Sequence, residues 1–197
     1  GIRDVAPSRG LGDVYKRHAL HSGKSVVTSN KELFCKYWFE LEKAAKRTNV
    51  GLYFEASCVG GVPIIRTLID GMQANVVNNL TGIINGTTNY ILTRMAREGL
   101  DYREALKDAQ ALGYAEKDPT ADVEGYDATY KLSILASLAF HTKVPLDKIY
   151  REGITDISRQ DIAYGEELGY VLKLLAIGKN DGKGNIEVRV HLSLIHI

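Results

Sequence analysis

Up to residue 57, the hydrophobic pattern of the chain changes back and forth between strand-like and helix-like segments. Residues 25–30 (SVVTSN) and 50–57 (VGLYFEAS) are short runs rich in β-branched and aromatic residues, which favour strands. Between them, residues 31–47 carry apolar side chains at the spacing of one helix face: Leu33, Phe34, Tyr37, Trp38 and Leu41. A further helix is predicted over residues 14–22 and ends at Gly23. A strand, a helix and a second strand with short joins predict a parallel α/β sheet.

After residue 57 the pattern becomes typical of an α+β domain. Residues 63–72 begin with Pro and predict a short helix, and the β-branched residues of segment 74–85 predict a strand. Four further helices are predicted over residues 89–99, 101–113, 126–140 and 156–169. Two strands, 170–179 and 186–195, are joined by NDGKGN and predict a β-hairpin.

These patterns predict an α/β domain followed by an α+β domain. Residues 1–55 form the α/β part, a partial Rossmann-type parallel sheet, and residues 56–197 form the α+β part. No GxGxxG turn follows a first strand, so the phosphate-binding half of a dinucleotide fold is missing from the pattern. We therefore expect the chain to begin within such a domain.

Composition and charge exclude several classes of partner. The 197 residues include 25 Lys and Arg and 24 Asp and Glu, and the formal net charge of +1 gives no field that attracts nucleic acid or an anionic membrane. No apolar run approaches the roughly 20 residues that span a bilayer. Cys35 and Cys58 form no CxxC pair, and the histidines form no HExxH or Cys/His cluster, so no disulfide framework or transition-metal site is expected. We expect a cytoplasmic protein with no nucleic-acid or membrane partner.

Charged residues gather in segment 112–132, at the start of a long apolar helix. The segment contains Glu116, Lys117, Asp118, Asp122, Glu124, Asp127 and Lys131. One interpretation is a solvated helix entry, with Asp118 as the N-cap and Pro119 at the first helical position. In that interpretation Asp127 and Lys131 form an exposed pair that contributes about 0.3–0.5 kcal/mol. The other interpretation is a polar pocket for a small zwitterion, built on a loop of a rigid scaffold.

Lys31 raises the same question in the first domain. It follows VVTSN, at the carboxyl end of a predicted parallel strand. Open α/β sheets bind ligands along that edge. A solvated lysine at a helix start explains the residue as well, although its charge opposes the helix dipole there. The position at the strand end favours a functional role.

Four longer motifs occur in one order along the chain: VVTSNKELF (26–34), FEASCVGGVPII (54–65), NNLTGIINGTTNYILTRM (78–95) and GYAEKDPTADVEGYDATYKL (113–132). Together they resemble homoserine dehydrogenase, and the similarity extends from about residue 20 to residue 191. The resemblance implies NAD(P)H-dependent reduction of L-aspartate 4-semialdehyde, a small amino-acid substrate, to L-homoserine. This oxidoreductase step belongs to threonine, methionine and isoleucine biosynthesis. Residues 1–13 and 192–197 depart from the family pattern, and we expect a fragment of the enzyme.

The resemblance also implies roles for the two domains. Residues 1–55 would be the last part of the dinucleotide-binding domain, and residues 56–197 would be most of the catalytic and dimerisation domain. The intact enzyme would be a homodimer. Thr28, Asn30 and Lys31 would contact the cofactor, NADP or NAD.

Three residues match the family's reacting groups. Lys131 matches the proton donor to the aldehyde oxygen, and Lys31 matches a second lysine near the reacting hydroxyl. Asp127 would orient Lys131 or the substrate hydroxyl. Reduction of a carbonyl creates alkoxide charge, and ammonium groups aimed at that charge stabilise it.

Four further residues match the family's substrate pocket. Glu116 matches the carboxylate that holds the substrate ammonium, and Asp122 matches a second acidic residue there. The substrate carboxylate would meet Gly86 and Thr87, whose backbone N–H and hydroxyl groups suit it. A strand-to-helix turn capped by Thr explains these two residues as well, and both interpretations can hold together.

The segment EASCVGGVP resembles the family's loop for a monovalent cation. Glu55 and the backbone carbonyls of Cys58, Gly60 and Val62 would ligate sodium or potassium, hard ions that accept oxygen ligands. Val59 departs from the family pattern, which has a small residue there. We expect strain at Val59 if the position needs a positive φ.

Two interpretations from other classes stay open. In the first, Cys58 is the thiolate nucleophile of a phosphorylating aldehyde dehydrogenase, with a histidine as its base. In the second, the chain is a folded, non-catalytic fragment that binds substrate or oligomerises. Unchanged activity after alkylation of Cys58 would exclude the first. A chain that stays folded and dimeric but neither binds cofactor nor turns over would support the second.

Overall fold

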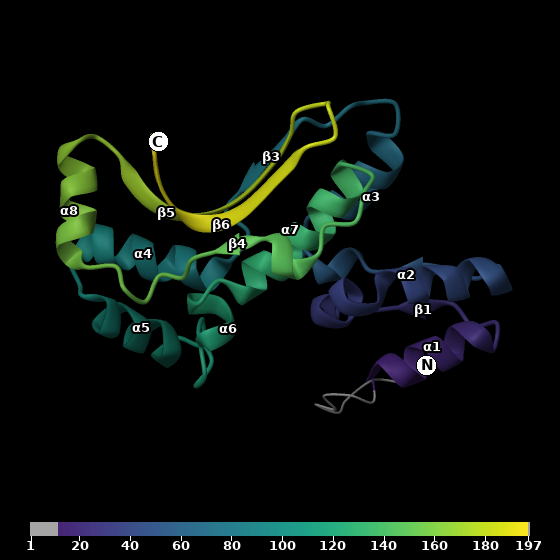
Figure 1. The fold of residues 1–197 in the computed structure, drawn as a ribbon. Helices are drawn as coiled ribbons and strands as arrows, with labels where there is room; N and C mark the ends of the chain where they lie inside the picture. Colours follow the sequence, from purple (N-terminus) through teal and green to yellow (C-terminus); the bar gives the residue numbers. More distant parts are fainter. Residues whose placement is uncertain (1–11, 197) are drawn as a thin grey trace. The chain divides into compact units, whose positions relative to one another are not determined.

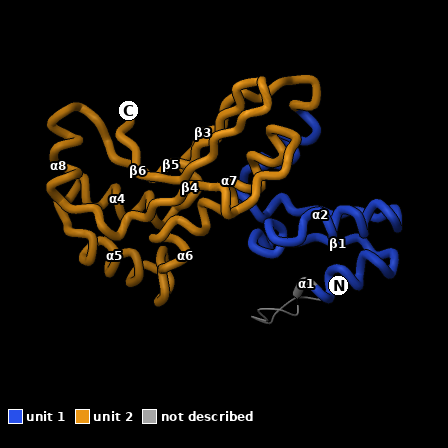
Figure 2. Tube along the Cα trace, in the orientation of Figure 1, with its two compact units in different colours: residues 1–71 blue, residues 72–197 orange. Residues whose placement is uncertain are grey.

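The chain divides into two compact units, Gly1–Gly71 and Met72–Ile197, and the computed structural model describes residues 12–196 (Figure 2). Each unit has its own sheet and its own buried apolar residues. The division falls after residue 71, whereas the sequence pattern places it after residue 55. Residues 56–71 therefore belong to the first unit, and the roles expected for the two domains stay predictions.

The first unit contains a parallel pair of strands with a long helix between them in sequence. Its elements are α1 (Gly12–His21), β1 (Val26–Val27), α2 (Lys31–Thr48), β2 (Leu52–Tyr53), the 3-10 helix η1 (Glu55–Ser57), α3 (Ile64–Arg66) and the π-helix η2 (Thr67–Gly71). Val26 pairs with Leu52 and Val27 with Tyr53, in parallel register. The strand–helix–strand order confirms the expected α/β class.

Both strands are shorter than the sequence pattern predicts. The first ends at Val27 because the chain turns at Thr28, whose Oγ1 accepts a hydrogen bond from the Asn30 N–H at 3.1 Å. The second ends at Tyr53 because Glu55–Ser57 form a 3-10 turn. β-Branched and aromatic residues mark segments that can pair, and local turns decide where the pairing ends.

Helix α2 packs an apolar face into the core of the first unit. Asn30 caps its first turn, with Oδ1 accepting the Leu33 N–H at 3.0 Å, and Asn49 ends it in the left-handed region with φ of 53°. Phe34 is fully buried and stacks on Phe54, with ring centroids 3.8 Å apart. This contact joins the helix to the segment that follows β2.

The second unit packs helices against a four-stranded mixed sheet, which confirms the expected α+β class. Its elements are β3 (Asn79–Gly82), α4 (Gly86–Glu98), α5 (Tyr102–Ala111), α6 (Thr120–Val123), α7 (Tyr126–Ala139), the 3-10 helix η3 (Leu146–Lys148), β4 (Tyr150–Arg151), α8 (Arg159–Glu167), β5 (Val171–Asn180) and β6 (Ile186–Ile195). The strand order is β3-β5-β6-β4, with β5 antiparallel to β3 and β6, and β4 parallel to β6. Helices α4 and α7 lie along one face of the sheet (Figure 1).

The hairpin expected from the sequence is present, because β5 and β6 pair along all 10 residues of each strand. Two other strands differ from the prediction. β3 covers only Asn79–Gly82 of segment 74–85, since the chain then leaves the sheet and Asn85 caps α4. β4 was not predicted at all, because its 2 residues are too few to show a period.

The charged segment forms two helices in the structure. The sequence predicts Asp118 as the N-cap, but Pro119 occupies that position before α6. Asp118 still contacts the first residue of the helix, because its Oδ1 accepts the Thr120 N–H at 3.2 Å and the Thr120 hydroxyl at 2.6 Å. Between α6 and α7, Gly125 takes φ of 77°, and a side chain there would lie 3.0 Å from the Glu152 carbonyl oxygen. This turn separates Asp122 on α6 from Asp127 on α7, while Glu116 and Asp118 lie on the loop before α6.

Helix α7 passes through the core of the second unit. Leu132 and Ile134 are fully buried, while Asp127 and Lys131 occupy the first two turns of the same helix. Side chains on a buried helix have few alternative positions. The packing of α7 therefore restricts where the side chains of Asp127 and Lys131 can lie.

Candidate active site

Asp127 and Lys131 lie one turn apart on α7 and form a largely buried ion pair. Lys131 Nζ lies 2.7 Å from Asp127 Oδ2, and the two side chains are only 17% and 7% exposed. The same Nζ donates to the Ile84 carbonyl oxygen at 2.8 Å. The interpretation as an exposed pair is therefore wrong, because the protein excludes most water from both groups. An ammonium held by two acceptors has a defined position, which a proton donor needs.

Asn85 connects this ion pair to a second carboxylate. Its side chain is 5% exposed, and Nδ2 donates to Asp127 Oδ2 at 2.9 Å and to Asp122 Oδ1 at 2.7 Å. We name these residues, Lys131, Asp127, Asn85 and Asp122 with the Ile84 carbonyl, the Lys131 network. Two carboxylates and one ammonium leave one net negative charge in the network, which favours a further cation beside it.

The N-terminus of α4 belongs to the same arrangement. Asn85 is its N-cap, and Oδ1 accepts the Thr88 N–H at 2.8 Å. The N–H groups of Gly86 and Thr87 lie in the first turn, where a helix offers no internal acceptor and the dipole favours negative charge. Thr87 Oγ1 donates to the Tyr114 carbonyl oxygen at 2.8 Å, so an anion would be bound by the Thr87 backbone N–H rather than by its hydroxyl proton.

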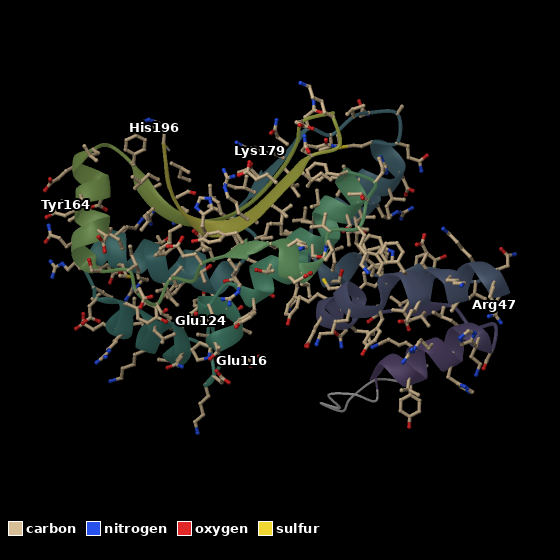
Figure 3. All side chains as sticks on the ribbon, viewed as in Figure 1. Arg47, Glu116, Glu124, Tyr164, Lys179 and His196 are labelled. Carbon is tan, nitrogen blue, oxygen red and sulfur yellow. The ribbon has the colours of Figure 1, made fainter. Side chains whose placement is uncertain are left out.

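Glu116 is exposed on the loop between α5 and α6 (Figure 3). Gln110 of α5 holds this loop, since its Nε2 donates to the Glu116 carbonyl oxygen at 3.0 Å. Asp122, in contrast, is half-buried and bonded to Asn85. Of the two acidic residues expected in the substrate pocket, the structure therefore brings Asp122 into the Lys131 network and leaves the Glu116 side chain facing water.

Asn85 is the residue of the network that sequence reasoning missed. The sequence carries one signal for it, an Asn directly before a predicted helix, and that signal indicates an N-cap. Its partners Asp122 and Asp127 are 37 and 42 residues away. Only the fold brings them together.

Thr28, Asn30 and Lys31 lie in the first unit, at the carboxyl end of β1. Thr28 is 6% exposed and its Oγ1 accepts the Asn30 N–H, while Asn30 Oδ1 caps α2, so both side chains shape the turn from strand to helix. Lys31 is the first residue of the 18-residue helix α2 and is half-buried. A lysine and a helix start at this edge of a parallel sheet fit an anionic dinucleotide.

Glu55 ties the expected cation loop to the start of α3. Its Oε1 accepts the Ile65 N–H and its Oε2 accepts the Arg66 N–H, both at 2.9 Å. A carboxylate at the start of a helix satisfies N–H groups that have no acceptor inside the helix. Glu55 therefore has a structural role, and its role as a cation ligand stays a prediction.

The other expected ligands are backbone carbonyls of the loop between η1 and α3. Cys58, Gly60 and Val62 lie there, and the Val62 carbonyl accepts the Ile64 N–H at 2.8 Å. Within residues 12–196, no three His, Cys, Asp or Glu side chains are grouped as metal ligands. A cation on this loop would depend mainly on carbonyl oxygens, as the hard monovalent ions permit.

Cys58 is 0% exposed, and the Ser57 hydroxyl lies 3.8 Å from its sulfur. A thiolate nucleophile must reach its substrate, and such cysteines are partly exposed. The interpretation as a phosphorylating aldehyde dehydrogenase therefore does not fit, and Cys58 packs as a small apolar side chain.

Val59 has a positive φ of 45°, the condition under which we expect strain at this position. A β-branched side chain crowds the backbone in this region, which costs about 1–2 kcal/mol. We expect Val59→Gly to raise the free energy of unfolding of the first unit by about 0.5–1 kcal/mol, since the relief exceeds the added freedom of glycine in the unfolded chain. Trp38, the one tryptophan of the chain, lies in this unit, so its fluorescence in urea measures the change.

Val59→Ala is the matched control, because alanine keeps the crowding Cβ. Val59→Ala should raise the free energy of unfolding by less than half as much as Val59→Gly does. Equal stability of the glycine and alanine variants would show that the backbone is not strained at this position.

A parallel strand–helix–strand unit, followed by an α+β unit with helices packed on a mixed sheet, places the chain in the class of mixed α and β proteins. The family model for homoserine dehydrogenase matches residues 63–197. The chain belongs to the homoserine dehydrogenase family, as its motifs predict.

Individual relatives agree with this assignment. The chain is 48% identical over 177 residues to a homoserine dehydrogenase of Neisseria gonorrhoeae, covering 90% of this chain and 40% of the relative. It is 48% identical over 181 residues to one of Bacillus subtilis, covering 92% of this chain and 42% of the relative. The chain thus spans about 40% of the length of these relatives.

Solved structures of the family share the fold. A homoserine dehydrogenase from Thiobacillus denitrificans superimposes with a TM-score of 0.92 at 45% identity, covering 96% of this chain and 44% of that one. A hyperthermophilic archaeal homoserine dehydrogenase, solved in complex with NADPH, gives 0.77 at 28% identity, covering 97% of this chain and 54% of that one.

Proposed function

We propose that this chain is the amino-acid-binding part of an NAD(P)-dependent homoserine dehydrogenase, which reduces L-aspartate 4-semialdehyde to L-homoserine in threonine, methionine and isoleucine biosynthesis. The Lys131 network carries the proposal: Asp127 and the Ile84 carbonyl hold a buried ammonium next to the capped start of α4. The network offers a proton, negative charge and N–H donors together. Reduction of an amino-acid aldehyde needs all three.

The two charges of the substrate have complementary partners in this arrangement. The α-carboxylate would accept hydrogen bonds from the Gly86 and Thr87 N–H groups in the first turn of α4. The ammonium would lie against the acidic side, where Asp122 supplies a half-buried carboxylate and Glu116 an exposed one. Glu116 would close over the ammonium from its exposed loop.

Lys131 would complete the reaction as the proton donor. Reduction gives the aldehyde oxygen a negative charge, and Nζ of Lys131 transfers a proton to that oxygen to form the hydroxyl. Asp127 keeps the ammonium in place through the 2.7 Å ion pair. In the reverse direction the neutral amine accepts the proton from homoserine.

The first unit would bind the cofactor. When bound, NADP or NAD supplies the hydride. Lys31 and the turn at Thr28 and Asn30 would hold the cofactor at the carboxyl end of β1, and Lys31 would also serve as the second lysine of the reaction.

Three finer assignments accompany this proposal. Sodium or potassium would bind Glu55 and the carbonyls of Cys58, Gly60 and Val62. The intact enzyme would be a homodimer. It would act in the cytoplasm, as the cysteine usage of the sequence suggests. Separately, none of the helices within residues 12–196 has the length and apolar character of a membrane span.

Calorimetric titration of the chain with L-homoserine tests the proposal. We expect binding by the unaltered chain and an affinity about tenfold lower for Glu116→Gln, because the variant loses a charge–charge contact with the substrate ammonium. Glu167→Gln on α8 removes a surface carboxylate elsewhere and is the matched control, with unchanged affinity.

Absence of binding by a chain whose circular dichroism shows it to be folded would overturn this assignment and support the non-catalytic alternative. Equal affinities of Glu116→Gln and the unaltered chain would remove Glu116 from the site while leaving Asp122 as the ammonium partner.

A further inference from the structure

We infer that Asn85 is a positioning residue, whose single amide group fixes Lys131 and Asp127 for proton transfer and holds Asp122 beside them. The inference rests on the proposed role of Lys131 as proton donor. In this role Asn85 acts through the groups it holds, Asp122, Asp127 and, through Asp127, Lys131.

The orientation of the Asn85 amide is determined by its surroundings. Carboxylates only accept hydrogen bonds, and Asp122 and Asp127 both lie within 2.9 Å of one amide atom, which must therefore be the nitrogen. On the opposite side, the Thr88 N–H at 2.8 Å and the Thr88 hydroxyl at 2.9 Å meet the oxygen. Thr88 is 0% exposed, so no water replaces these contacts. The amide has one possible orientation.

Residues 84 and 85 hold both members of the ion pair from one side. The Ile84 carbonyl accepts from Lys131 Nζ at 2.8 Å, and the Asn85 amide donates to Asp127 Oδ2 at 2.9 Å. That Asp127 oxygen is the same one that contacts Lys131. Ammonium and carboxylate are therefore both fixed to consecutive residues at the start of α4, which is more restrictive than the ion pair alone.

The same amide keeps two like charges together. The oxygens of Asp122 and Asp127 approach one nitrogen from α6 and α7, two helices that a turn at Gly125 separates. Without an N–H donor between them, two carboxylates this close repel each other. Asn85 thus lets the site present two carboxylates to a substrate ammonium while α6 and α7 stay in place.

An N-cap alone does not require asparagine at this position. Ser and Asp cap helices about as well, because each offers an oxygen to the N–H groups of the first turn. Neither has the NH₂ group that donates to two acceptors while the same side chain accepts at its oxygen. The bridging donor, and not the cap, is therefore the feature that distinguishes a positioning role.

The test compares Asn85→Ser and Asn85→Asp, which keep the cap and lose the donor. The matched control is Asp101→Ser, which exchanges one capping residue for another at α5. The first readout is the ¹⁵N signal of the Lys131 ammonium, assigned by its loss in Lys131→Arg. The second is the affinity for L-homoserine. We expect the control to keep the ammonium signal and both Asn85 variants to lose it through faster proton exchange, with an affinity about tenfold lower.

The two readouts separate this inference from the proposed function. If folded Asn85→Ser and Asn85→Asp chains keep the Lys131 signal of the unaltered chain, Asn85 is only a cap and the inference is wrong. If the signal is lost in both variants but the unaltered chain does not bind L-homoserine, the positioning role stands and the substrate assignment fails.

Discussion

Lys131→Met is expected to lower the free energy of unfolding of the chain by about 3 kcal/mol, because it leaves the Asp127 carboxylate buried without its cation. The Asp127 side chain is 7% exposed, so water cannot replace the lost ammonium. Methionine keeps most of the length and the apolar contacts of the lysine stem, so the loss reflects charge rather than packing. Urea denaturation followed by circular dichroism measures the change.

A double-mutant cycle with Asp127→Asn isolates the pair. Asparagine at position 127 keeps an oxygen for the Asn85 donor and removes the carboxylate charge that Lys131→Met leaves without a cation. The double variant should therefore be no less stable than Lys131→Met alone, with a coupling energy of about 1–3 kcal/mol. Strictly additive effects would show that the two charges do not stabilise each other.

Helices were the most predictable part of the fold. The sequence places α2 at 31–47 and the structure at Lys31–Thr48, because the apolar face of the helix marks it locally. The ten-residue strands of the hairpin were predicted for a similar reason, since the polar turn between them fixes the register. The short strands were predicted too long or not predicted, because the ends of a strand depend on turns and pairing partners outside the segment.

The candidate site was predictable in its parts and not in its connections. Family motifs identify Asp122, Asp127 and Lys131 residue by residue, and the spacing of the last two puts them on one helix face. Burial of that pair could not be read from the spacing, because the same i, i+4 pattern is usual on exposed helices. The role of Asn85 could not be read either, since the capping signal describes only its oxygen and says nothing of its NH₂ group.

Gly153→Ala should be among the most damaging single-methyl additions in the second unit. A Cβ at Gly153 would lie 2.6 Å from the Val123 carbonyl oxygen and 2.9 Å from Glu124 Cα. Both are backbone atoms, so no side-chain rotation relieves the overlap. The Val123 carbonyl also accepts the Ile154 N–H at 2.8 Å, so its displacement costs a hydrogen bond. We expect the free energy of unfolding to fall by about 3 kcal/mol.

The displaced backbone of Gly153→Ala is the junction of α6 and α7, the two helices that carry Asp122 and Asp127. L-Homoserine binding by the folded fraction should therefore weaken as well, because the junction sets the separation of the two carboxylates that Asn85 bridges. Gly71→Ala is the matched control, since no atom lies within 4 Å of the added Cβ, and it should change stability by less than about 0.5 kcal/mol. If Gly153→Ala is as stable as this control, the junction of α6 and α7 moves aside without loss of stability. The separation of the Asp122 and Asp127 carboxylates would then be set by Asn85 and not by the junction.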